Sequence, residues 1–288
     1  MDIDRVFVAG TGHMGSGIAQ LMAVNGKEVF MYDATAALAE NARLKIIASL
    51  SKLASGGKIS AADRDACAGR LSVTADLNDA ARCGMAIEAV TENPDIKAPL
   101  LRALGEALPE RALLASNTSS ISITTLASHV KHPERFAGMH FFNPVHAMKL
   151  VEIVRGLLTS DGTAAALKTL AGSLGKVAIV CKDSPGFIVN RLVDPMLNEA
   201  AYLVGEGVAA PADIDLAVVN GLNHRMGPLA LIDLIGVDVV YDVMKVLYQS
   251  FGDTKYRPCP LLKQMIDANL LGRKSGRGFY EYNAEGGV

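Results

Sequence analysis

The stretch Arg5-Val6-Phe7-Val8-Ala9-Gly10-Thr11-Gly12-His13-Met14-Gly15 decides the fold of this chain. An apolar run rich in valine comes first, and three glycines follow it with the spacing Gly-x-Gly-x-x-Gly. Gly10 permits a tight turn after a strand, Gly12 lets a phosphate approach the backbone, and Gly15 lets a helix pack closely on that strand. The stretch therefore predicts a strand, a turn and a helix whose N-terminus binds the pyrophosphate of a dinucleotide.

An acidic residue ends the next expected strand, Glu28–Tyr32. Asp33 follows that strand and lies 18 residues after Gly15. A carboxylate at this place hydrogen-bonds the adenosine ribose and repels a 2′-phosphate. Because no arginine follows before Arg43, we expect NAD rather than NADP. His13, inside the turn, is interpreted as a spacer residue.

Strands and helices alternate through the first two-thirds of the chain. Further strands are expected at Met85–Ala89, Leu113–Ser116, Phe136–His140, Val151–Val154 and Val177–Val180. Helices are expected at Gly15–Ala23, Thr35–Lys52, Pro94–Ala107 and Gly162–Leu174. This alternation predicts a mostly parallel sheet covered on both faces. The glycines at Ser55-Gly56-Gly57 indicate a turn within a helical hairpin that runs from Thr35 to about Arg70.

The periodicity becomes helical after a breaker at Asp183–Gly186. Ser184 and Pro185 are typical of a helix N-cap and first helical position. Further helices are expected at Phe187–Gly205, Ala212–Asn220, Leu229–Ser250 and Cys259–Ala268. The predicted fold is therefore α/β, with a Rossmann-type doubly wound sheet and its hairpin in residues 1–184 and an all-helical domain in residues 185–288.

Composition excludes several classes of function. The 288 residues carry a net charge of −2, which favours neither nucleic acid nor a membrane surface as partner. No apolar run reaches the roughly 18 residues of a membrane helix, and a strand begins where a signal peptide would stand. The four cysteines are scattered without metal-ligand spacing, so we expect neither a metal site nor disulfides. We expect a reducing, cytoplasmic compartment.

Polar residues follow the expected strands at the edge where ligands bind in such a sheet. Ser119 follows Leu113–Ser116, His140 ends the next strand, and Glu152 lies 12 residues further on a return strand. A carboxylate bonded to one imidazole nitrogen orients the ring, and the other nitrogen exchanges a proton with an alcohol. Taken singly, each residue also has a structural interpretation, such as a helix cap for Ser119 or a surface charge for Glu152.

The chain resembles the L-3-hydroxyacyl-CoA dehydrogenase family, of the short-chain or 3-hydroxybutyryl-CoA type, over essentially its whole length. The matching motifs are Gly10-x-Gly12-x-x-Gly15, Glu92-Asn93, Ser116-Asn117-Thr118-Ser119-Ser120, His140-Phe141-Phe142-Asn143-Pro144, Lys149-Leu150-Val151-Glu152, Asp183-x-Pro185-Gly186-Phe187-x-x-Asn190-Arg191, Met226-Gly227-Pro228 and Gly278-Phe279-Tyr280. Arg225 departs from the family pattern, which usually has proline there.

The resemblance implies a role for each matching residue. His140 would be the acid–base group, oriented by Glu152, in the interconversion of (S)-3-hydroxyacyl-CoA and 3-oxoacyl-CoA. Ser119 and Asn190 would bond the reacting oxygen or the thioester region. The implied NAD contacts are Asp33, Glu92, Lys97, Asn143 and Lys274. The coenzyme A phosphates have less clear partners, and Arg43, Lys45 and Lys52 are candidates beside the alternative of a solvated helix face.

Two other functions stay open at this stage. A sugar-acid or hydroxy-acid dehydrogenase on the same fold would oxidise a free carboxylate substrate instead of a coenzyme A thioester. A non-catalytic NAD-binding protein would turn over neither kind of substrate. The strongly apolar segment Leu229–Ser250 favours a homodimer formed through the helical domain. Acyl-chain length and pathway are not determined, with fatty-acid β-oxidation, butyrate or polyester metabolism and aromatic degradation all compatible.

Overall fold

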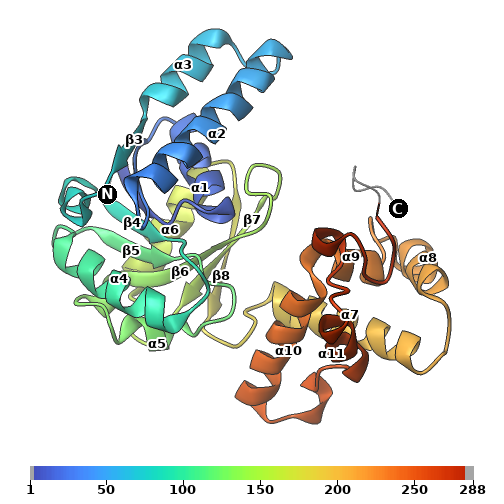
Figure 1. Cartoon of the computed structure of the whole chain (residues 1–288). Coiled ribbons are helices and arrows are strands. Elements are labelled where there is room, and N and C mark those ends of the chain that lie inside the picture. The colour runs from blue at the N-terminus through green and yellow to red at the C-terminus, as the bar shows by residue number, and fades with distance from the viewer. Residues whose placement is uncertain (1–2, 283–288) are drawn as a thin grey trace. The chain divides into compact units, whose positions relative to one another are not determined.

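The computed structural model describes residues 3–282, and the chain divides into two compact units, Met1–Ser184 and Pro185–Val288 (Figure 1). Within the described residues, no helix is both long and apolar enough to cross a membrane.

The first unit is built on one eight-stranded sheet with the order β3-β2-β1-β4-β5-β6-β7-β8. Its strands are β1 Arg5–Ala9, β2 Glu28–Tyr32, β3 Leu71–Thr74, β4 Met85–Glu88, β5 Leu113–Ser116, β6 Phe136–Phe141, β7 Leu150–Arg155 and β8 Val177–Lys182. Every neighbouring pair is parallel except β6 and β7, which are antiparallel. The predicted mostly parallel sheet is therefore confirmed.

Helices cover both faces of this sheet. They are α1 His13–Val24, α2 Ala36–Ser55, α3 Ala61–Gly69, α4 Pro94–Ala107, α5 Ile123–Ala127 and α6 Asp161–Ser173, with short 3₁₀ turns η1 Leu77–Arg82 and η2 Pro133–Arg135. In β1, consecutive residues Val6, Phe7 and Val8 are all fully buried, because alternate side chains point into opposite apolar layers. The layer that contains Val6 and Val8 includes apolar residues of α1 and α6.

Strand β3 was absent from the sequence-based prediction. It has only four residues, and the solvent-exposed Ser72 interrupts its apolar pattern. Its pairing with β2, which aligns Leu71 with Val29, makes it a strand at the edge of the sheet. Whether such a short segment forms a strand depends on contacts with the neighbouring strand rather than on its own sequence pattern.

The helical hairpin forms as predicted, from α2 and α3. The side chain of Thr35 caps α2, and Ser60 with Asp63 forms a capping box at the start of α3. Between the helices Gly57 adopts a φ of +69°, a conformation that glycine takes without steric cost.

The second unit is helical, as expected. Its helices are α7 Val189–Gly205, α8 Pro211–Leu222, α9 Pro228–Ile235, α10 Val237–Phe251 and α11 Pro260–Asp267, with 3₁₀ turns η3 Thr254–Tyr256 and η4 Arg273–Ser275. Two sequence-based details are wrong. Ser184 and Pro185 do not start a helix, because Gly186 and Phe187 take positive φ values and α7 begins only at Val189. The predicted helix Leu229–Ser250 is two helices.

Gly236 causes that division. Its φ of +115° lies outside helical geometry, and it ends α9 and precedes α10. Apolar residues continue through both helices, so the hydrophobic pattern alone does not reveal the break. Leu234 and Val239, on either side of Gly236, are exposed within the single chain at 48% and 43%.

Two buried aspartates explain the glycine motifs of the second unit. Asp215 accepts the backbone N–H groups of Leu229 (2.7 Å) and Ala230 (2.9 Å), and so caps α9. Asp233 accepts the N–H groups of Phe279 (3.0 Å) and Tyr280 (2.9 Å) in the final segment. Any side chain at Gly227 would collide with Asp215, and any side chain at Gly278 would collide with Asp233.

Candidate active site

The glycine turn has the geometry that its spacing predicts. Gly10 has a φ of +95°, and its N–H donates to the carbonyl of Tyr32 (2.8 Å). A Cβ on Gly15 would collide with the backbone of Gly10, so α1 packs directly on the turn. A Cβ on Gly12 would meet nothing within 4 Å. Gly12 is also the N-cap of α1 and has no side chain to bond the first N–H groups of the helix. These N–H groups can therefore receive an anion.

Asp33 holds this turn from the end of β2. Its Oδ2 accepts the N–H (2.7 Å) and the hydroxyl (2.5 Å) of Thr11, and its Oδ1 accepts the N–H of Ala34 (2.7 Å). Burial by itself would raise the pKa of Asp33, but these hydrogen bonds lower it below the ordinary value. Asp33 is therefore an anion at neutral pH, beside the turn that would receive a dinucleotide.

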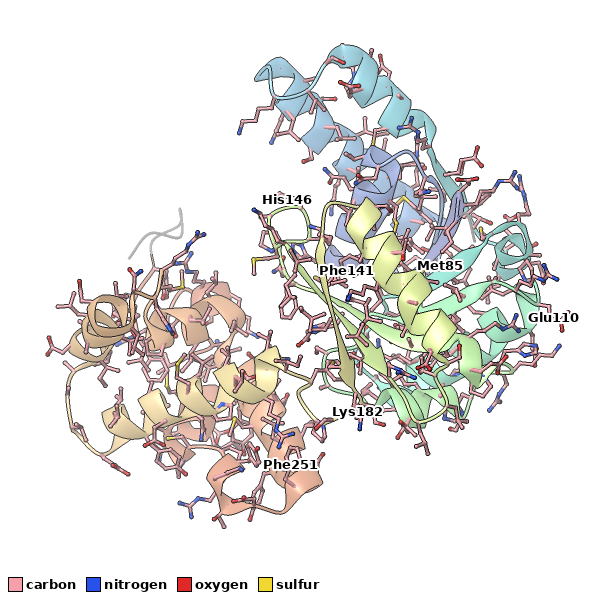
Figure 2. All side chains as sticks on the ribbon, turned by 180° about the vertical axis from the view of Figure 1, so that it is seen from behind. Met85, Glu110, Phe141, His146, Lys182 and Phe251 are labelled. Carbon is pink, nitrogen blue, oxygen red and sulfur yellow. The ribbon has the colours of Figure 1, made fainter. Side chains whose placement is uncertain are left out.

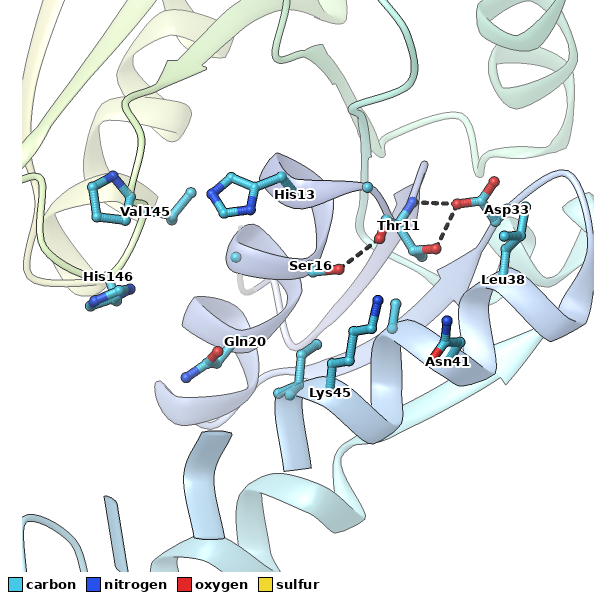
Figure 3. A pocket seen from close by; sticks show the side chains of 15 residues that line it. Thr11, His13, Ser16, Gln20, Asp33, Leu38, Asn41, Lys45, Val145 and His146 are labelled. Carbon is cyan, nitrogen blue, oxygen red and sulfur yellow. Dashed lines mark hydrogen bonds between the residues drawn. The ribbon is translucent and has the colours of Figure 1, made fainter. Parts of the chain in front are cut away.

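A cavity of about 680 Å³ adjoins the turn (Figure 3). It lies between the start of α1, the middle of α2 and the segment after β6, and its lining includes Gly12, Ser16, Asp33, Lys45 and His146. An open glycine, free helix N–H groups and an anionic acid are the features that the adenosine diphosphate half of NAD requires. The residues present therefore fit this cofactor.

His13, which the sequence interpretation treats as a spacer residue, makes a side-chain contact. Its Nε2 lies 2.7 Å from Oδ1 of Asn143, and because an amide oxygen only accepts, Nε2 carries the hydrogen. This bond joins the glycine turn to the segment after β6. The only sequence signal for it is a titratable side chain within a turn that small residues usually fill.

The predicted catalytic pair is assembled by the one antiparallel pairing in the sheet. His140 on β6 and Glu152 on β7 are directly opposite in register. Nδ1 of His140 lies 2.7 Å from Oε2 of Glu152, and both residues are buried, with 5% and 1% exposure. The ring of Phe142 lies against the imidazole, at 4.5 Å between ring centroids. The carboxylate therefore fixes the imidazole with its Nδ1–H toward Glu152.

Ser119 lies in a turn that Glu92 organises at the ends of β4 and β5. Glu92 Oε1 accepts the backbone N–H groups of Ser119 and Ser120, both at 2.9 Å. Lys97 is almost wholly buried and forms ion pairs with Glu88 (2.7 Å) and Glu92 (3.2 Å). The ammonium of Lys97 therefore binds the protein's own oxygens.

The three basic candidates on α2 differ in their surroundings. Arg43 is held by Glu40 through two hydrogen bonds, Nε to Oε2 (2.9 Å) and Nη2 to Oε1 (2.7 Å). Lys52 lies exposed in the last turn of the helix. Lys45, by contrast, lines the cavity beside the glycine turn (Figure 3).

Two predicted site residues belong to the second unit. Asn190 is half-buried in the first turn of α7. Lys274 lies in η4, where its ammonium forms an ion pair with Asp238 at the start of α10. Their roles beside the residues of the first unit stay predictions.

Among the described residues, no group of three or more histidines, cysteines or acidic residues is arranged to hold a metal ion. The first unit instead combines a dinucleotide turn, an acid at the ribose position and a buried imidazole–carboxylate pair at the same edge of the sheet. These features define an NAD-dependent dehydrogenase.

Comparison with known proteins identifies the family. Residues 5–184 match the family model described as 3-hydroxyacyl-CoA dehydrogenase, NAD binding domain, and residues 186–282 match 3-hydroxyacyl-CoA dehydrogenase, C-terminal domain. The chain therefore belongs to the 3-hydroxyacyl-CoA dehydrogenase family.

Full-length relatives support this assignment. The chain is 46% identical over 282 residues to the probable 3-hydroxybutyryl-CoA dehydrogenase of Bacillus subtilis, covering 98% of each chain. It is 45% identical over 279 residues to the 3-hydroxybutyryl-CoA dehydrogenase of Clostridioides difficile, covering 97% of this chain and 99% of the relative. The crystal structure of (S)-3-hydroxybutyryl-CoA dehydrogenase from Ralstonia eutropha aligns with a TM-score of 0.95 at 46% identity, covering 98% of this chain and 100% of that one.

Proposed function

We propose that this dehydrogenase interconverts (S)-3-hydroxyacyl-CoA and 3-oxoacyl-CoA, and that 3-hydroxybutyryl-CoA or another short-chain thioester is its substrate. The names of its full-length relatives support the substrate class. The observation that carries the chemistry is the buried bond of 2.7 Å between His140 and Glu152.

This pair can exchange one proton with the reacting oxygen. Because Nδ1 donates to Glu152, the ring can gain a further proton only at Nε2. In alcohol oxidation, Nε2 takes the hydroxyl proton while Glu152 stabilises the resulting imidazolium; in ketone reduction, Nε2 returns the proton. NAD, when bound, accepts or supplies the hydride. Oxidation therefore requires the neutral ring as proton acceptor, and reduction requires the protonated ring as proton donor.

The remaining site residues are assigned by the same proposal. Ser119 and Asn190 hydrogen-bond the reacting oxygen or the thioester region of the substrate. Asn143, Glu92 and Lys274 contribute to the NAD site together with Asp33 and the glycine turn. Lys97 acts through Glu92, because its ammonium already binds Glu88 and Glu92.

Lys45 is the best candidate among the basic residues of α2 for binding a nucleotide phosphate. It lines the cavity beside the glycine turn, whereas the guanidinium of Arg43 is engaged by Glu40. Its charge would act on a phosphate of the bound cofactor or of coenzyme A.

Replacement of His140 tests the chemistry. We expect His140→Gln to reduce kcat for acetoacetyl-CoA reduction by about 10²–10⁴-fold, the usual contribution of general acid–base catalysis, with little change in NADH binding. The matched control is His224→Gln, an exposed histidine of the second unit. Full activity of the His140 variant would exclude the imidazole as the acid–base group.

The substrate class is tested by comparing acetoacetyl-CoA with free acetoacetate, each with NADH and with NADPH. The proposal predicts turnover of the thioester with NADH. Preference for the free acid would favour a hydroxy-acid dehydrogenase, and tight NADH binding without any turnover would favour a non-catalytic protein. A chain-length series of 3-oxoacyl-CoA thioesters would then define the acyl preference.

We also propose that the enzyme is a cytoplasmic homodimer formed through its helical unit. Leu216 and Leu222 on α8 and Leu234 on α9 are exposed apolar residues within the single chain, as expected of surfaces that meet a partner. The four cysteines are free thiols, which suits a reducing compartment. A monomer in light scattering at micromolar concentration would contradict the dimer.

A further inference from the structure

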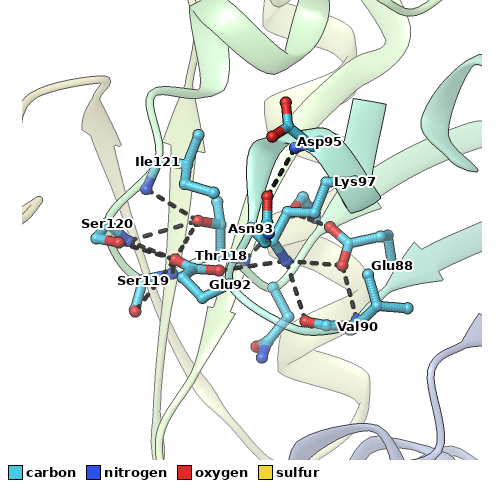
Figure 4. A network of polar contacts seen from close by, with 12 residues as sticks. Glu88, Val90, Glu92, Asn93, Asp95, Lys97, Thr118, Ser119, Ser120 and Ile121 are labelled. Carbon is cyan, nitrogen blue, oxygen red and sulfur yellow. Dashed lines mark hydrogen bonds and ion pairs between the residues drawn. The ribbon is translucent and has the colours of Figure 1, made fainter. Parts of the chain in front are cut away.

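A buried ion pair underlies the turn that carries Ser119. Glu88, the last residue of β4, is fully buried, and Lys97 on α4 is 1% exposed. The ammonium of Lys97 lies 2.7 Å from Oε1 of Glu88, 3.3 Å from the carbonyl of Val90 and 3.2 Å from Oε2 of Glu92 (Figure 4). The contacts with Glu88 and Val90 are hydrogen bonds, and the contact with Glu92 is an ion pair.

Glu92, the second carboxylate that contacts Lys97, fixes the turn that carries Ser119. Oε1 of Glu92 accepts the hydroxyl of Thr118 (2.6 Å) and the N–H groups of Ser119 and Ser120 (2.9 Å each). Burial would raise the pKa of Glu92, but the Lys97 charge and these hydrogen bonds lower it below the ordinary value. Glu92 therefore stays an anion, and its position fixes the turn.

A second set of hydrogen bonds, through Ser116, connects Glu88 to the same turn. Oε2 of Glu88 accepts the hydroxyl of Ser116 (2.5 Å), and the oxygen of that hydroxyl accepts the N–H of Thr118 (3.2 Å). The residue between them, Asn117, accepts the N–H of Phe141 through Oδ1 (2.9 Å). Phe141 follows His140 directly. The Glu88 network therefore joins the ends of β4, β5 and β6.

We propose that Glu88 is a positioning residue for catalysis. This inference rests on the proposed function, in which Ser119 contacts the reacting oxygen. Glu88 orients Lys97, which orients Glu92, and together with Ser116 they fix the Ser119 hydroxyl relative to the His140 strand. Glu88 itself is fully buried and accepts hydrogen bonds from Val90, Lys97 and Ser116 (Figure 4).

The alternative is that the network serves stability alone. Removing one member of a buried ion pair is destabilising, so loss of activity in a single variant does not separate the two roles. A double variant that replaces both Glu88 and Lys97 separates the two roles. It removes both charges of the pair from the interior, and it also removes the Lys97 ammonium that contacts Glu92.

The test compares Glu88→Gln with the double variant Glu88→Gln/Lys97→Met. Glu110→Gln, an exposed carboxylate of the same unit (Figure 2), is the matched control. We expect Glu88→Gln to lower kcat for acetoacetyl-CoA reduction by about 10–100-fold. The double variant should recover the urea midpoint of the wild type but not its kcat. Recovery of kcat together with stability would overturn the proposal, as would a kcat for Glu88→Gln within twofold of the wild type.

Two further measurements keep the test decisive. Ser116→Ala removes only the hydrogen bonds that connect Glu88 through Ser116 to Thr118. We expect this variant to lower kcat by a smaller factor, about three- to tenfold. It tests the proposal even if Glu88→Gln does not fold. Amide hydrogen exchange at Ser119 and Ser120 is read without any substrate. Faster exchange in the Glu88 variant than in the Glu110 variant supports the proposal, and equal exchange contradicts it. A wild-type protein inactive on every acyl-CoA would refute the proposed function, while the exchange result would still decide the role of Glu88.

Discussion

Buried carboxylates have different kinds of partner in the two units. In the first unit, Glu88 binds an ammonium and Glu152 binds an imidazole, at the carboxyl edge of the sheet. In the second unit, Asp215 and Asp233 accept backbone N–H groups and tyrosine hydroxyls, which are neutral donors. The partners rather than the burial therefore distinguish the carboxylates that we propose to support the chemistry from those that fix the chain.

The physical reason lies in what each partner can do. An imidazole changes its charge during the reaction, so a fixed anion beside it stabilises one protonation state over the other. A backbone N–H does not titrate, so a carboxylate bonded to N–H groups alone fixes the chain without favouring one protonation state of a reacting group.

Replacement of the histidine's carboxylate should give the largest effect. Glu152→Gln keeps the shape of the side chain but removes the anion that stabilises the imidazolium. We expect kcat for acetoacetyl-CoA reduction to fall by about 10²–10⁴-fold, with the unfolding midpoint changed little by comparison. A variant that lost stability but kept kcat would place Glu152 with the structural carboxylates and break the comparison.

Asp194 on α7 should show a pH-dependent effect. Burial raises its pKa to about 7, well above its ordinary value of 3.8. The folded protein therefore binds this proton more tightly than the unfolded chain, so stability decreases as pH rises from about 4 to about 7 and then levels off. At about 1.4 kcal/mol per pKa unit, Asp194→Asn should be more stable than the wild type by up to about 4 kcal/mol at pH 8, with no gain near pH 4. Urea unfolding at both pH values measures this, and a pH-independent difference would contradict it.

Removing the cap of α9 should affect stability alone. Asp215→Asn weakens two bonds to backbone N–H groups and one to the Tyr280 hydroxyl. We expect the free energy of unfolding to fall by about 2 kcal/mol, while kcat per folded molecule stays within twofold of the wild type. Denaturant unfolding and active-site titration of the same preparation measure both quantities. A tenfold loss of kcat in fully folded protein would show that the second unit's carboxylates also serve the chemistry.

The smallest effect is expected at His13. His13→Leu removes one exposed hydrogen bond to Asn143, a contact of about 1 kcal/mol. We expect the KM for NADH to rise roughly fivefold, with kcat nearly unchanged. Initial rates at varied NADH measure this, with His224→Gln as the control. A large loss of kcat instead would mean that His13 takes part in the reaction itself.

Local pattern determined the predictable part of this protein. The glycine spacing at Gly10-x-Gly12-x-x-Gly15 specifies a turn because only glycine suits the positive φ at Gly10 and the close packing at Gly15. The alternation of strands and helices specifies a mostly parallel sheet, and the switch near Asp183 to helical periodicity specifies a second, helical part. The pairing of His140 with Glu152 was also predictable, because the two residues lie on consecutive strands joined by a short connection.

Tertiary structure alone decided the rest. Strand β3 exists because β2 offers an unpaired edge, and Gly236 divides an apolar segment because its φ is positive. The contact of His13 with Asn143, and the buried network of Glu88, Lys97 and Glu92, join residues whose separation in sequence follows no period. Side-chain partners depend on how elements pack in three dimensions, whereas sequence pattern reports only which face of an element is apolar.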